Sequence, residues 1–186
     1  MSDAISVRRL LNRAAELYDE PGGALAASAG RAGRHGFRSG AEWMRRAMET
    51  IRGAPIPPSR ANFHALGILK YGAAGAVALG WAIATLLLDV PLLAVVSGPL
   101  FYAVEAQSVF LFPVALDGSA RPFRDARRGT VRAGGTLRVM AIVMPIAAVM
   151  LFSGFAGWGF RRSWCLGCLA VCVWYEALRE ADVPAA

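Results

Sequence analysis

The chain has 186 residues and a formal net charge of +7, and 56% of its residues are hydrophobic. That length fits one soluble domain, but the hydrophobic residues are concentrated in blocks after position 62, which is typical of a helical membrane protein. Arginines retained on the cytoplasmic side of a membrane and attracted to anionic lipids account for the charge. We therefore do not expect nucleic acid to be a partner.

Residues 1–61 are predicted to form a cytoplasmic region that begins with an amphipathic helix. Apolar side chains recur at helical spacing over residues 4–18, and Ser2 or Asp3 is placed to cap the first turn. Arginines occupy the opposite side. Such a helix either lies in the lipid interface or folds over the membrane domain.

A linker and a second amphipathic helix are expected next. Residues 21–40 are rich in Gly, Ala, Ser and Arg, so they have little to bury and are predicted to be flexible. Ser39 and Glu42 fit a capping box, which would start a helix that continues to about Ile51. Several prolines then lead the chain to the membrane.

Residues 62–180 are predicted to form an all-α membrane domain, followed by a short tail at 181–186. Each of its apolar stretches is long enough, at about 1.5 Å per residue, to approach or exceed the thickness of a hydrocarbon layer. The shortest is flanked by arginines that can extend to the interface, with a re-entrant segment as its alternative. We expect a compact four-helix transmembrane bundle with spans at about residues 63–88, 91–116, 137–158 and 163–178.

The arginines predict an orientation for this bundle. Most of them precede the first span or fall between the second and third, whereas Arg161 and Arg162 precede the fourth. Because basic residues stay inside, both termini are expected in the cytoplasm of a bacterial-type inner membrane, with Arg161 and Arg162 outside. The basic loop is expected to contact anionic lipid head groups through Arg121, Arg124, Arg127 and Arg128.

Small residues form a stripe along the first predicted span. They recur at intervals of four and are Gly72, Ala76, Gly80 and Ala84. Such a stripe allows the backbone of another helix to approach closely within lipid. It predicts helix packing, including contact with a membrane-protein partner or a second copy of the chain.

The first two spans contain one intramembrane lysine and one intramembrane glutamate. A hairpin that folds back near Asp89 places Lys70 about one helical turn from Glu105, within reach of an ion pair. Tyr102 and Ser108 share a helix face with the carboxyl group. The pair either fixes the register of the hairpin or makes Glu105 a proton carrier or ligand contact.

Three cysteines fall on one face of the fourth predicted span, at positions 165, 168 and 172. Arg161, Arg162 and the helix N-terminus would favour a thiolate in the Cys165-Leu-Gly-Cys168 pair. In this respect the chain resembles the quinone-linked thiol oxidoreductases related to vitamin K epoxide reductase, which implies a redox pair here. The chain has no second cysteine pair, and apolar packing is the alternative role.

The sequence contains no other recognisable catalytic motif. His35 and His64 have no metal ligand at helical spacing, so neither a metal nor another cofactor is expected. We expect a non-enzymatic accessory, assembly or scaffolding subunit of a larger membrane system that contacts anionic lipid. The alternatives are a membrane enzyme or carrier that uses Glu105, and a thiol oxidoreductase that uses Cys165 and Cys168.

Overall fold

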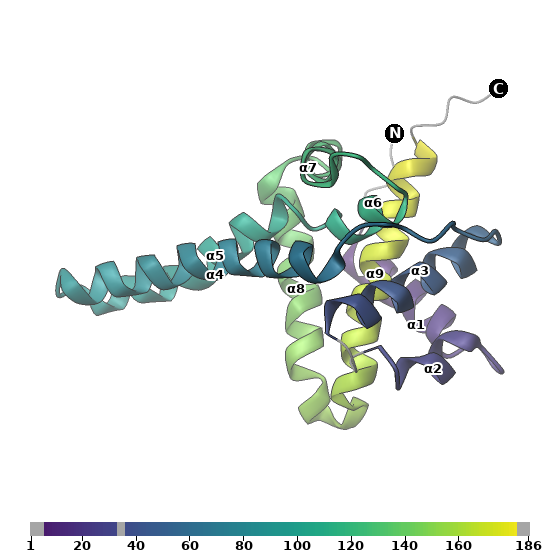
Figure 1. Ribbon diagram of the computed structural model, residues 1–186. Helices are drawn as coiled ribbons and strands as arrows, with labels where there is room; N and C mark the ends of the chain where they lie inside the picture. Colours follow the sequence, from purple (N-terminus) through teal and green to yellow (C-terminus); the bar gives the residue numbers. More distant parts are fainter. Residues whose placement is uncertain (1–5, 33–35, 182–186) are drawn as a thin grey trace.

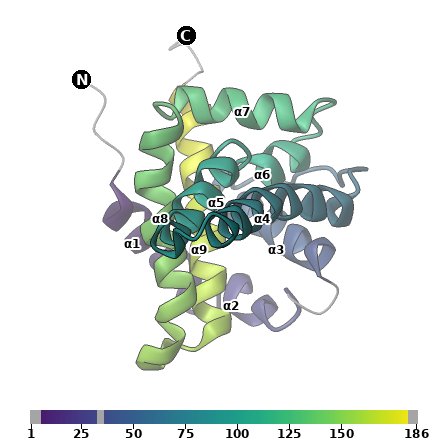
Figure 2. The same cartoon turned by 90° about the vertical axis from the view of Figure 1, so that its left-hand side faces the viewer.

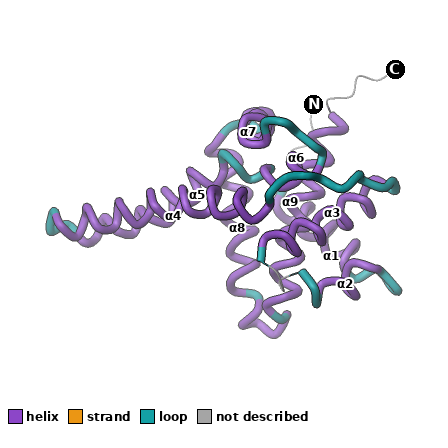
Figure 3. The backbone as a smooth tube through the Cα atoms, in the orientation of Figure 1, coloured by secondary structure: helices purple, strands orange, loops and turns teal. Residues whose placement is uncertain are grey.

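A computed structural model describes residues 6–32 and 36–181, and these residues form helices joined by turns and short loops, without strands. Two bodies are visible in Figure 1: a globular group of helices, and a long helical hairpin that projects from it. The smooth tube in Figure 3 shows the same division, with helix along nearly the full length of the projecting part. The expected all-α class is confirmed.

The N-terminal region contains both expected amphipathic helices, now α1 (Val7–Tyr18) and α3 (Phe37–Arg52). Ser6 caps α1 by accepting a hydrogen bond from the amide of Arg9. The alternative caps, Ser2 and Asp3, lie outside the described residues. Both helices bury their apolar faces in the globular part, which favours the prediction that they fold over the rest of the chain.

The linker between these helices is more structured than its composition predicts. Residues 24–29 form α2 (Ala24–Ala29), and the side chain of Leu25 is buried. The indole nitrogen of Trp43 in α3 donates a hydrogen bond to the Leu25 carbonyl over 3.2 Å. Ser39 is not the helix cap, because α3 begins two residues earlier and the Ser39 hydroxyl donates to the carbonyls of Ala32 and Gly36.

The projecting hairpin is formed by α4 (Phe63–Leu87), the 3-10 segment η1 (Pro91–Val96) and α5 (Ser97–Ala106). The chain reverses at the predicted place, where Asp89 has a positive φ of 57°. Near this tip, the indole nitrogen of Trp81 donates to the Leu93 carbonyl over 2.9 Å and links the two legs. The predicted helical hairpin is thus confirmed for its tip and both legs.

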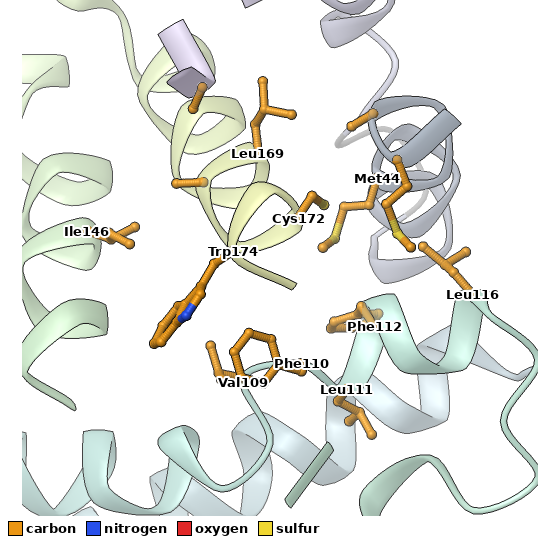
Figure 4. Close-up of a cluster of buried hydrophobic side chains, with 14 of the residues drawn as sticks. Met44, Val109, Phe110, Leu111, Phe112, Leu116, Ile146, Leu169, Cys172 and Trp174 are labelled. Carbon is orange, nitrogen blue, oxygen red and sulfur yellow. The ribbon is translucent and has the colours of Figure 1, made fainter. Parts of the chain in front are cut away.

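The second predicted span does not continue as one helix. After α5 the chain turns and forms α6 (Leu111–Leu116), whose six residues are all buried in the globular part. Just before α6, the ring of Phe110 packs edge-on against Trp174, with ring centroids 5.1 Å apart. Figure 4 shows these two side chains together in the core. The apolar run therefore supplies one leg of the hairpin and part of a globular core.

The expected arginine-rich loop is largely a helix, α7 (Pro122–Arg132). It leads into α8 (Thr136–Phe152) through a bend of 95°. A short π-helical turn, η2 (Gly154–Trp158), then connects α8 to α9 (Phe160–Ala181). Figures 1 and 2 show that the paired helices α8 and α9 run crosswise to the hairpin, so α8 and the hairpin cannot both follow the normal of one flat bilayer.

The described residues provide two or three apolar helices of membrane-crossing length, which is fewer than the four expected. Two are α4 and the stretch Pro91–Leu116, and the bent pair α7–α8 would be the third. The fourth expected span, α9, is not among them. Its charged residues lie near its two ends, at positions 161–162 and 176–180, and it buries Leu169, Cys172 and Trp174 against the surrounding globular helices.

One contact of α9 also contradicts the expected orientation. Arg162, expected outside the cell, forms a bidentate ion pair with Asp19 at the end of α1, which was expected inside. The Arg162 guanidinium also lies 5.9 Å from the ring centre of Tyr18. Residues in direct contact cannot lie on opposite sides of a bilayer, so α9 does not separate two membrane faces in this structure.

Candidate functional site

The hairpin exposes the apolar side chains that a soluble protein would bury. Leu79 is 62% exposed, Leu87 is 81% exposed and Leu92 is 88% exposed. Between Lys70 and Glu105, Asp89 at the tip is the one charged residue. A contiguous apolar surface of this size is unusual on a soluble monomer and is typical of a membrane or protein contact. The hairpin is the first candidate functional surface.

Its length matches a lipid layer. The seventeen residues from Tyr71 to Leu87 extend α4 beyond Lys70 by about 26 Å, close to the hydrocarbon thickness of roughly 30 Å. Asp89 at the tip would then lie near the far head groups, and Lys70 and Glu105 near the head groups beside the globular part. Both polar ends of the hairpin therefore fall where a membrane has water or polar groups.

The predicted small-residue stripe lies on the exposed side of α4. Gly72, Ala76, Gly80 and Ala84 are exposed, whereas Ala74 and Thr85 are buried between the hairpin legs. A Cβ atom built at Gly72 or Gly80 meets no other atom within 4 Å. Within the described chain the stripe packs against no helix, so its packing role remains a prediction about other molecules.

A second exposed apolar stripe runs along α8. Its buried side, which includes Val139, Val143 and Ile146, joins the core, while the outer positions recur at intervals of three and four. Figures 1 and 2 place α8 on the side of the globular part from which the hairpin projects. The outer stripe consists of Leu137, Ala141, Met144, Ala148 and Leu151 of α8, followed by Phe155 of η2.

The arginines predicted to contact lipid are on and just before α7. Arg121, Arg124, Arg127 and Arg128 are all exposed. Asp125 partly offsets their charge: it accepts hydrogen bonds from the Ser119 hydroxyl, over 2.6 Å, and from Arg128. The Ser119 hydrogen bond and the nearby arginines lower the pKa of Asp125. Because α7 adjoins α8, basic and apolar surfaces are neighbours.

The predicted ion pair is present at the root of the hairpin. Lys70 Nζ lies 3.3 Å from Glu105 Oε1, and both side chains are largely buried. The ammonium group also lies 4.9 Å from the ring centre of Tyr71. The other two members of the predicted cluster do not reach the carboxylate through a hydrogen bond: Ser108 donates to the Glu105 backbone carbonyl, and Tyr102 packs edge-on against Phe101.

This ion pair lines a cavity of about 340 Å³ between the hairpin root and the globular helices. Its walls are mostly apolar and come from α3, α8 and α9, as well as the hairpin. Both cysteines of the predicted redox pair, Cys165 and Cys168, also line it. The structure therefore brings together two groups of candidate residues that are far apart in the sequence.

The cysteines are suited to packing rather than to thiolate chemistry. All three are free, and Cys165 and Cys172 are buried. Burial raises the pKa of Cys165 to about 11 although Arg161 lowers it, and burial raises the pKa of Cys168 to about 12. The expected activation of the thiols by nearby positive charge is wrong, because desolvation has the larger effect.

Sequence reasoning missed a second ion-pair network, which joins α3, α6 and α9. Arg52 pairs with Asp117 at 2.7 Å and with Glu176 at 2.6 Å, and Glu176 is 2% exposed. Burial opposes the charge of Arg52, but hydrogen bonds to Asp117 and Glu176 raise its pKa overall. The sequence carries only a weak signal for this network, a glutamate in an otherwise apolar stretch of α9.

Within the described part of the chain, His64 forms no metal site. His64 is exposed, with its ring centre 6.2 Å from that of Phe37, and His35 lies outside the described residues. Over the ranges 6–32 and 36–181, no group of three or more potential metal ligands occurs.

Comparisons with family models, curated proteins and solved structures find no match to this chain.

Proposed function

We propose that this protein is an accessory or scaffolding subunit of a larger system in a bacterial-type inner membrane, held there by its α4–α5 hairpin. The observation that carries this proposal is the projecting pair of apolar legs with no covering element in the described chain. Exposure of these apolar side chains to water is unfavourable, whereas their contact with hydrocarbon is not. A two-span hairpin replaces the four-span bundle predicted from sequence.

In this arrangement the globular helices lie on one side of the membrane. Their arginines favour the cytoplasmic side, so both ends of the chain would be cytoplasmic. The basic positions of α7 would contact anionic head groups, and the outer stripe of α8 would lie along the interface. Membrane lipids are therefore the first proposed partners.

A second partner would pack on the hairpin inside the membrane, and it is a membrane protein or another copy of this chain. The support is the small-residue stripe Gly72, Ala76, Gly80 and Ala84, which is exposed and leaves room for a helix backbone. Burial raises the pKa of Cys165 and Cys168, so these two thiols do not support the oxidoreductase alternative. Holding partners together is the role that the surfaces support best.

The test uses the full chain in its native membrane. A photo-reactive residue at Ala76 should cross-link to a protein partner, whereas the same residue at Leu87, near the hairpin tip, should cross-link mainly to lipid. With the photo-reactive residue kept at Ala76, the double change Gly72→Leu and Gly80→Leu should remove the protein product, and Leu79→Ile is the matched control on the same helix. Equal cross-linking from both positions, or no effect of the double change, would contradict the scaffold role.

A further inference from the structure

We propose that the cavity at the hairpin root binds a neutral amphiphile, a molecule with an apolar body and a hydroxyl head group. The cavity volume of about 340 Å³ lies in the range of small-molecule sites. Such sites are mostly apolar and have a few polar groups that orient the ligand. Here the polar groups are Lys70 and Glu105.

Small side chains create the space for the apolar body. Gly40 and Ala41 line the cavity from α3, and Ala147 lines it from α8. Larger apolar residues on the same helices complete the walls. An apolar cavity excludes water and accepts apolar guests, and a cavity of about 150 Å³ already holds a benzene molecule in another protein. The larger cavity here suits an alkyl or prenyl chain.

The ion pair defines the head group. The Lys70 ammonium has three N–H groups, of which the contacts with Glu105 Oε1 and with the Tyr71 side chain engage two. The carboxylate has a second oxygen, Oε2, besides the one that contacts Lys70. A hydroxyl group can accept from the lysine and donate to the carboxylate at the same time. An anionic head would be repelled by Glu105, and a cationic head by Lys70, so a neutral head is favoured.

The position of the cavity indicates where the ligand comes from, and this step rests on the proposed membrane insertion. Lys70 and Glu105 lie where the hairpin leaves the globular part, which would be the level of the lipid head groups. Trp164 also lines the cavity and is 52% exposed, so the cavity reaches the surface at this residue. A membrane lipid with a hydroxyl head could enter here with its chain inward.

Binding is tested with three probes of equal chain length: 1-dodecanol, dodecanoate and dodecylamine. Native mass spectrometry of the detergent-solubilised full chain should show one dodecanol per protein, bound at least tenfold more tightly than either charged probe. Dodecanol should also slow the reaction of Cys168, which is half-buried at the cavity wall, with N-ethylmaleimide. Absence of binding, a preference for a charged probe, or unchanged reaction of Cys168 would overturn the proposal.

Two variants distinguish binding of dodecanol in the cavity from its nonspecific binding to exposed apolar surface. Ala147→Phe fills the cavity and should reduce dodecanol binding at least tenfold, whereas Ala148→Phe, on the exposed outer stripe, should leave it unchanged. The pair Lys70→Met with Glu105→Gln should keep a bound chain but lose the preference for dodecanol. Equal effects of the two alanine changes, or a preference retained without the ion pair, would contradict the assigned site.

The source of the ligand is tested separately. Organic extraction of protein purified from native membranes should yield a hydroxyl lipid in about equal amount to the chain, and Ala147→Phe should reduce it. A cytosolic alcohol recovered instead would overturn the membrane source. Because probe binding is measured in detergent without a bilayer, its failure is distinguishable from failure of hairpin insertion or partner binding.

Discussion

Two regions of this molecule have the same mean hydropathy, 1.4, and different surroundings. In the most apolar eighteen residues of α4, 17% are buried, whereas in the corresponding window of Pro91–Leu116 56% are buried. The first forms a leg of the projecting hairpin, and the end of the second lies in the globular core (Figures 1 and 4). Apolar length therefore identifies a segment that avoids water, and only its packing shows whether lipid or protein replaces the water.

The difference follows from the partners that each segment meets. Phe110 meets Trp174 of α9, and the helix that follows it, α6, packs against α3 and α7. The outer face of α4 meets no helix of the described chain. A helix that is apolar all round is buried in a core or in a membrane. The contrast between core and hairpin leads to four measurable expectations.

The largest expected effect is the loss of a core aromatic ring. Phe110 is fully buried against Trp174, so Phe110→Ala should lower the free energy of unfolding by about 3–5 kcal/mol. The matched change on the hairpin, Leu79→Ala, removes an exposed side chain and should change it by less than about 0.5 kcal/mol in detergent. Denaturant unfolding followed by circular dichroism measures the free energy of unfolding of both variants. Similar losses of stability for Phe110→Ala and Leu79→Ala would contradict the distinction between a protein core and an exposed hairpin.

Breaking the ion pair at the junction of the two regions should cost slightly less. Glu105→Gln leaves the Lys70 ammonium without its counter-charge and should destabilise the fold by about 3 kcal/mol. This value is near the lower end of the range observed when one partner of a buried ion pair is removed. Lys70→Met combined with Glu105→Gln should recover most of this loss, because no unpaired charge remains. Thermal unfolding and the yield of folded protein measure both variants. A double variant no more stable than Glu105→Gln would contradict a pairing role.

The arginines of α7 should have a smaller effect, on membrane binding rather than on folding. Each basic residue near an anionic surface contributes about 1 kcal/mol. Arg124→Gln with Arg127→Gln should therefore weaken binding to vesicles containing phosphatidylglycerol by roughly thirtyfold, and added salt should reduce the difference. Arg8→Gln with Arg9→Gln, on α1, provides the control. Equal effects of the two pairs of substitutions would contradict the proposal that α7 is the surface that contacts anionic lipid.

The smallest expected effect concerns thiol chemistry in the globular part. With a pKa of about 11, Cys165 should be almost entirely protonated at pH 8, and its rate of alkylation should rise about tenfold per pH unit up to about pH 11. Mass spectrometry after alkylation without reductant should find three free thiols. A disulfide between Cys165 and Cys168, or rapid alkylation at pH 7, would restore the redox alternative.

The sequence was sufficient to predict features that depend on local pattern. The amphipathic faces of α1 and α3, the reversal at Asp89, and the pairing of Lys70 with Glu105 all follow from helical spacing and from the position of the turn. The helix α2 escaped prediction because it has one large apolar residue, Leu25, and forms by packing against α3.

The sequence was insufficient where two elements had to meet. The role of α9 as a core helix depends on its contacts with α1 and α3, such as the pair between Arg162 and Asp19, which are separated by most of the chain. The cavity likewise has Lys70 of α4 and Cys168 of α9 in one lining, together with residues of α3, α5, α6 and α8. Neither spacing nor composition carries this information, because both depend on tertiary packing.

The depth of the hairpin tests the central claim most directly. A nitroxide attached at Val77→Cys, in a chain whose native cysteines are replaced by alanine, reports contact with oxygen in lipid or with a nickel complex in water. In lipid nanodiscs, oxygen should reach this label readily and the nickel complex should not, whereas a label at Arg127→Cys on α7 should show the reverse. A Val77 label as accessible to the nickel complex as the Arg127 label would contradict insertion of the hairpin.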